Sequence, residues 1–136
     1  MNSKSFNPID YQPQINNYCT MFLDKIMNEN QNILEIGIGI GTIWFLERLR
    51  HVTSIEYKNK GQIWFKDYSG NVDNSDFLNY LKKDIDKRNL MNKYTSYYIE
   101  TSIKANNGSD MEDLFKKMQI NNEKFDYILV DGHWCR

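Results

Sequence analysis

The sequence predicts an α/β fold, in which a sheet of parallel central strands lies between two layers of helices. Short apolar runs of strand length alternate along the chain with longer segments whose apolar residues recur every three or four positions. A glycine-rich turn joins the first run to the segment after it, and the last run, YILV, is apolar at every position. Alternation of this kind predicts parallel strands with helices on both faces, and a fully apolar strand is typical of the middle of such a sheet.

Length and composition restrict the class of protein. A chain of 136 residues fits one domain, and 40% hydrophobic and 14% aromatic residues argue for a packed core. The net charge of -1 supplies no field that would attract nucleic acid or an anionic membrane, so we expect neither as a partner. Cys19 and Cys135 have no metal-site spacing and fit two reduced thiols. No signal-like or membrane-spanning run is visible, so we expect a soluble, cytoplasmic protein without a metal.

The helices are predicted from the spacing of apolar residues. Residues 1–13 read as an irregular arm, and the domain is expected to cover residues 14–136. Ser75 is expected to cap the third helix, with Asp76 in its first turn. The expected helices and their apolar positions are 14–29 (Ile15, Tyr18, Cys19, Phe22, Leu23, Ile26), 42–50 (Ile43, Leu46, Leu49), 75–88 (Phe77, Leu78, Leu81, Ile85) and 110–120 (Met111, Leu114, Phe115, Met118).

The strands are predicted from short apolar runs bounded by polar or glycine residues. Residues 57–74 are mixed, and a short helix around 62–66 is expected there before a turn-rich piece. The expected strands are 32–36, 52–56, 95–100 and 125–132.

The glycine turn that follows the first strand is the most informative stretch. Gly37, Gly39 and Gly41 alternate with isoleucines, after Glu35 and before Thr42, and the turn opens a predicted helix. One glycine would permit the tight turn, another a close approach of the backbone to a ligand, and the third close packing of helix on strand. The alternative is an ordinary strand-to-helix turn without a ligand.

Glu56 ends the second strand, 19 residues after Gly37. An acid at about this distance from a glycine turn accepts hydrogen bonds from the ribose hydroxyls of an adenosine. Because the carboxyl ends of neighbouring parallel strands share one edge of the sheet, Glu56 and the turn are expected to lie side by side. The sequence therefore predicts a site for an adenosyl cofactor.

The glycine spacing favours S-adenosylmethionine over a dinucleotide. A dinucleotide fold uses Gly-x-Gly-x-x-Gly, which would place a glycine at position 42, where this chain has Thr42. The pattern Glu35-x-Gly37-x-Gly39-x-Gly41, preceded by a helix, resembles the first motif of the class I S-adenosylmethionine-dependent methyltransferases. The resemblance implies a Rossmann-like three-layer sandwich with strand order 3-2-1-4, and a role for Glu35 near the amino end of the methionine moiety. NAD(P) binding remains an alternative.

The fourth strand resembles a later motif of the same family. It ends in Val-Asp-Gly, followed by polar and aromatic residues, and Asp131, Gly132, His133 and Arg136 match this version. The resemblance implies that Asp131 positions cofactor or substrate near the reacting methyl. His133 has a suitable pKa for a general base toward the acceptor. By analogy, the acceptor would be a small molecule or a sugar.

The resemblance covers residues 14–136, but only four strands of a sheet that has seven in the family. The resemblance thus implies that the C-terminal strands are missing, and YILV is then expected to be an exposed apolar edge, which natural sheets avoid. We therefore expect either a truncated domain or pairing of this edge with a second copy or a partner chain. A methyltransferase is the first functional hypothesis, and a non-catalytic S-adenosylmethionine-binding subunit or remnant is the alternative.

Overall fold

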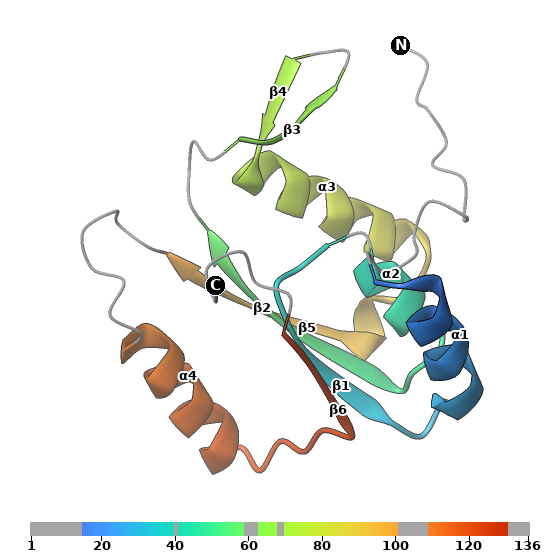
Figure 1. Cartoon of the computed structure of the whole chain (residues 1–136). Coiled ribbons are helices and arrows are strands. Elements are labelled where there is room, and N and C mark those ends of the chain that lie inside the picture. Colours follow the sequence, from blue (N-terminus) through green and yellow to red (C-terminus); the bar gives the residue numbers. More distant parts are fainter. Residues whose placement is uncertain (1–14, 40, 59–62, 68–69, 101–108, 131–136) are drawn as a thin grey trace.

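The computed structural model describes residues 15–39, 41–58, 63–67, 70–100 and 109–130. Its elements lie in an alternating order, with one hairpin inserted (Figure 1). They are α1 (Asn17–Ile26), β1 (Asn32–Ile36), α2 (Gly41–Leu46), β2 (His51–Lys58), β3 (Ile63–Asp67), β4 (Gly70–Asp73), α3 (Asn74–Lys87), the 3₁₀ helix η2 (Met91–Lys93), β5 (Tyr94–Glu100), α4 (Ser109–Ile120) and β6 (Tyr127–Val130).

A four-stranded parallel sheet with the order β5-β2-β1-β6 forms the centre. Numbered along the chain, its strands have the order 3-2-1-4, so the predicted fold class and strand order are confirmed. Ile36 of β1 is paired with Ile55 of β2 on one side and with Val130 of β6 on the other. The register therefore brings the carboxyl ends of β1, β2 and β6 to one edge of the sheet.

Helices cover both faces of this sheet, as predicted. Figure 1 shows α4 on one face and α1, α2 and α3 on the other. On the α4 face the buried residues are Leu34, Ile55, Ile99 and Met118. On the opposite face they are Ile33, Ile38, Ile43, Trp44, Phe45, Leu46, Leu49, Val52, Leu78, Leu81, Ile85 and Tyr94. None of the described helices has the length and apolar character needed to cross a membrane.

The predicted helices differ in how much of their apolar stripe is buried. The stripes of residues 43–49 and 78–85 are buried, as expected. The first helix is shorter than the predicted 14–29: the Asn16 side chain caps it by accepting the Tyr18 N–H at 2.8 Å, and Met27 is already extended. No residue of α1 is buried, and on its predicted stripe only Leu23 packs against the core.

The expected short helix around residues 62–66 is wrong, because this segment forms β3, which pairs antiparallel with β4. Ile63, Trp64 and Phe65 are β-branched or aromatic, which favours a strand once a partner strand is available. The expected Ser75 cap is also wrong, because α3 already begins at Asn74 and Ser75 lies in its first turn.

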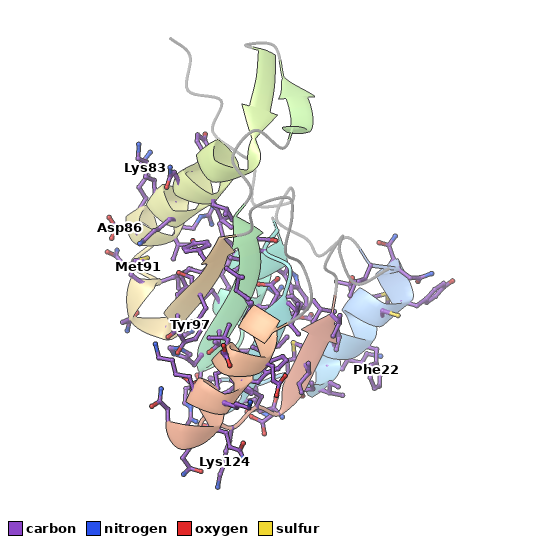
Figure 2. The ribbon with its side chains drawn as sticks, turned by 90° about the vertical axis from the view of Figure 1, so that its left-hand side faces the viewer. Phe22, Lys83, Asp86, Met91, Tyr97 and Lys124 are labelled. Atoms are coloured by element: carbon purple, nitrogen blue, oxygen red, sulfur yellow. The ribbon has the colours of Figure 1, made fainter. Side chains whose placement is uncertain are left out.

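Strand β6 forms one edge of the described sheet, and one of its faces is uncovered. Tyr127 and Leu129 pack against the core, whereas Ile128 and Val130 are 65% and 57% exposed. Phe22 on the neighbouring α1 is also exposed, on the side of the molecule away from α3 (Figure 2). The expected exposed apolar edge is therefore confirmed for the described residues.

We predict that this edge makes the protein associate. An edge strand with exposed apolar side chains offers both unpaired backbone groups and apolar surface to another chain. Sedimentation velocity over a concentration series should show association, and the double substitution Ile128→Lys, Val130→Lys should reduce it. Tyr80→Lys, at an exposed apolar position on α3, is the control and should leave the association unchanged. A wild-type protein that stays monomeric and does not aggregate would contradict the prediction.

Candidate functional site

Gly37 begins the glycine turn in a conformation that other residues rarely adopt. Its φ angle is 101°, which places it in the left-handed half of the backbone map. Its N–H donates to the carbonyl oxygen of Ile55 at 2.8 Å, so the turn stays tied to β2 after β1 has ended. The positive φ of Gly37 thus makes the tight turn off the strand.

Gly39 faces open space. A Cβ atom built on Gly39 would meet no heavy atom of the described chain within 4 Å, and its φ is not in the left-handed range. The packing around Gly39 therefore leaves room for a side chain, which is the arrangement expected where a ligand approaches the backbone. Gly41 is buried as the first residue of α2.

Glu56 lies directly against the turn. Its side chain is buried, with 6% exposed, and its Oε2 accepts the N–H of Ile38 at 2.8 Å. The sequence placed Glu56 and the glycines side by side from strand order alone, and the structure brings them together. The carboxylate thereby holds the backbone between Gly37 and Gly39 in place.

Glu35 lies beneath the same turn and is 3% exposed. Its Oε2 accepts the hydroxyl of Thr42 at 2.7 Å and the hydroxyl of Ser54 at 2.8 Å. The Thr42 hydroxyl oxygen in turn accepts the N–H of Gly39 at 3.3 Å. In this structure Glu35 therefore shapes the turn from below, whereas the expected contact with the amino end of a ligand stays a prediction.

Ser54 is a site residue that sequence reasoning missed. It is fully buried and is paired with Glu35 in the register of β1 and β2. Two residues apart on one strand, Ser54 and Glu56 lie on the same face of the sheet. A polar residue two positions before Glu56 in an otherwise buried strand is the signal that could have identified it.

Two buried carboxyl groups, those of Glu35 and Glu56, border the turn. Burial of an ionised carboxylate is costly unless hydrogen bonds compensate it, and here two hydroxyls and one backbone N–H donate to the two groups. Glu35 also lies at the first turn of α2, through its bond to Thr42. In their ionised form the two groups would suit a ligand that donates hydrogen bonds or carries positive charge, and would oppose a phosphate at this position.

The candidate catalytic residues Asp131 and His133, with Gly132 and Arg136, lie outside the described residues. The last described residue before them, Val130, is the β6 partner of Ile36, immediately before Gly37.

Trp44 is not available to stack on the ring of a cofactor. It is buried, packs edge-on against Phe45, and carries the Arg48 guanidinium 3.9 Å from its ring centroid.

A surface hollow of about 390 Å³ lies elsewhere and contains no residue of the glycine turn. Lys83, Asp86 and Met91 mark it on the outer side of α3 and the segment after it (Figure 2). Its other lining residues are Asn79 and Lys82.

Comparison of the chain with protein-family models, with curated proteins and with solved structures finds no match.

His51 begins β2 at the strand end opposite to the glycine turn, and its Nε2 lies 2.8 Å from the Thr95 hydroxyl. Burial lowers its pKa below the usual 6.5. Since the unfolded chain then binds this proton more tightly, the contribution of His51 to stability is present above pH 6.5 and is lost as pH falls through the folded pKa.

We predict that His51→Gln flattens the loss of stability on acidification. Urea unfolding at about pH 7.5 and about pH 5.5 should show a smaller difference in unfolding free energy for His51→Gln than for wild type. An equal difference for both proteins would show that other groups carry the pH dependence.

Proposed function

We propose that the glycine turn binds S-adenosylmethionine and that the protein is a methyltransferase. The observation that carries this proposal is the convergence of Glu35 and Glu56 on one turn whose central glycine, Gly39, faces open space. Open space above a glycine lets a ligand come into contact with the backbone. The carboxylates then decide which kind of ligand is favourable there.

The position of Glu56 favours a ligand that contains an adenosine. Its carboxylate lies at the carboxyl end of β2 beside the turn, where the ribose of a bound adenosine would offer two hydroxyl donors. An ionised carboxylate can accept about four hydrogen bonds in total, so Glu56 can accept from the N–H of Ile38 and from a ribose at the same time.

The charge beneath the turn favours S-adenosylmethionine over NAD. A dinucleotide places its diphosphate at the start of the helix after the first strand. Here the start of α2 is hydrogen-bonded to the buried carboxylate of Glu35, which would repel a diphosphate. S-adenosylmethionine carries a sulfonium and an ammonium group, and a negative site attracts both.

Methyl transfer to an acceptor hydroxyl or amine would use residues of the fourth motif. S-adenosylmethionine supplies an activated methyl group, whose carbon–sulfur bond breaks as the bond to the acceptor forms. Asp131 is proposed to position the reactants, and His133 to take the proton that the acceptor loses. A small molecule or sugar is the proposed acceptor, on the resemblance of the Val-Asp-Gly sequence alone.

The cofactor proposal predicts that substitutions at Gly39 and at Gly37 have different effects. Gly39→Ala should leave the protein folded, because its Cβ meets nothing, yet weaken S-adenosylmethionine binding about tenfold or more. Gly39→Val should abolish binding, and Glu56→Ala should weaken it. Gly37→Ala should instead lower stability by roughly 1–3 kcal/mol, because of its positive φ.

Calorimetric titration with S-adenosylmethionine, S-adenosylhomocysteine and NAD, together with thermal unfolding, measures these effects. Binding of the two adenosyl sulfur compounds but not of NAD is the expected result. If Gly39→Val and Glu56→Ala bind like wild type, the ligand site lies elsewhere.

The catalytic proposal predicts that methyl transfer depends on Asp131 and His133 while cofactor binding survives their loss. The acceptor would first be found by screening small molecules and sugars for methyl transfer from labelled S-adenosylmethionine. With this acceptor, His133→Gln should reduce kcat, most strongly near neutral pH. Asp131→Asn should reduce kcat as well. Binding without transfer to any acceptor would favour the alternative, a non-catalytic binding subunit.

A further inference from the structure

We propose that Ser54 is a positioning residue for the ligand site, acting on the glycine turn through Glu35 and Thr42. This inference rests on the proposed cofactor function of the turn, but it concerns a residue whose hydroxyl is hydrogen-bonded to Glu35 and not to the turn itself. A run of hydrogen bonds leads from inside the sheet to the backbone N–H of Gly39, where the ligand is expected to approach.

The hydrogen bonds have a defined direction. Ser54 donates its single hydroxyl proton to Glu35 Oε2 at 2.8 Å, and Thr42 donates to the same oxygen at 2.7 Å. Because Thr42 has used its proton, its oxygen can only accept, and it accepts the Gly39 N–H at 3.3 Å. The ionised form of Glu35 thus fixes the orientation of Thr42, which fixes Gly39.

The run begins inside the sheet, because Ser54 lies on β2 and Glu35 on the neighbouring β1. From Glu35 it passes to Thr42 on α2 and ends at the N–H of Gly39, in the turn between β1 and α2.

Burial makes the arrangement sensitive to the loss of one donor. Thr42 and Ser54 are fully buried and Glu35 is 3% exposed, so bulk water has little access to replace a missing hydroxyl. Removal of the Ser54 hydroxyl withdraws a hydrogen bond from the charged form of Glu35, which raises the pKa of that carboxyl. A protonated Glu35 can donate to Thr42, and the orientation that holds Gly39 is then no longer enforced.

The experiment compares Ser54→Ala with Thr53→Val. Thr53 is a buried neighbour on the same strand whose side chain points to the opposite face of the sheet, so it controls for loss of a buried hydroxyl. Calorimetric titration with S-adenosylhomocysteine at pH 6, 7 and 8 should show about tenfold weaker binding for Ser54→Ala, with the larger loss at pH 6. Thr53→Val should keep the wild-type affinity and pH profile.

Two further variants test the route through Glu35 and Thr42. Thr42→Val should weaken binding as Ser54→Ala does, and Thr42→Ser, which restores the hydroxyl, should recover most of the affinity. In a Glu35→Gln background, Ser54→Ala should have little further effect, because the group through which it acts is already changed. Additive effects of Ser54→Ala and Glu35→Gln would overturn the proposal.

A readout without ligand separates this inference from the proposed function. Hydrogen exchange of the Gly39 amide, followed by NMR, should be faster in Ser54→Ala than in wild type and unchanged in Thr53→Val. If wild type binds no adenosyl compound but Gly39 exchange still responds to Ser54, the cofactor proposal fails and the positioning role stands. If Ser54→Ala only lowers the unfolding temperature, with affinity, pH profile and Gly39 exchange unchanged, Ser54 is merely structural and the positioning proposal is wrong.

Discussion

The buried carboxylate of Glu35 is the constraint around which the rest of the site is arranged. A charge in a protein interior is tolerated only where donors surround it, and here two hydroxyls donate to one oxygen. The parallel register of β1 and β2 supplies Ser54 from the side, and the glycine turn brings Thr42 back over the strand end. The turn therefore has its shape for an electrostatic reason as well as a conformational one.

Glu35 and Glu56 engage different backbone N–H groups of the turn. Glu56 accepts the N–H of Ile38, and Glu35 reaches the N–H of Gly39 through Thr42. Backbone N–H groups in such a turn would ordinarily be offered to an anionic ligand. In this chain Glu56 and, through Thr42, Glu35 already engage both N–H groups, so the turn is held by the protein's own acids.

Much of the fold could be predicted because burial imposes a period on the sequence. The apolar run 32–36 matches β1, and Leu78, Leu81 and Ile85 are buried on α3 as their spacing indicates. The hairpin of residues 63–73 was missed because a strand forms only when a partner strand is available, and the local sequence pattern does not reveal that partner. The role of Ser54 was missed for a related reason: it depends on strand register, and a shift of one residue would send its side chain to the other face.

Topology explains why the site and the uncovered edge meet. The chain leaves β1 through α2 to reach β2 on one side, whereas β6 arrives on the other side through α4, which covers the opposite face. Strand order thus reverses at β1, and ligands of open α/β sheets bind at the carboxyl ends of strands where this happens. Val130 is paired there with Ile36, one residue before the glycine turn, and it is also exposed at the edge. The uncovered edge strand is therefore also the strand that borders the turn.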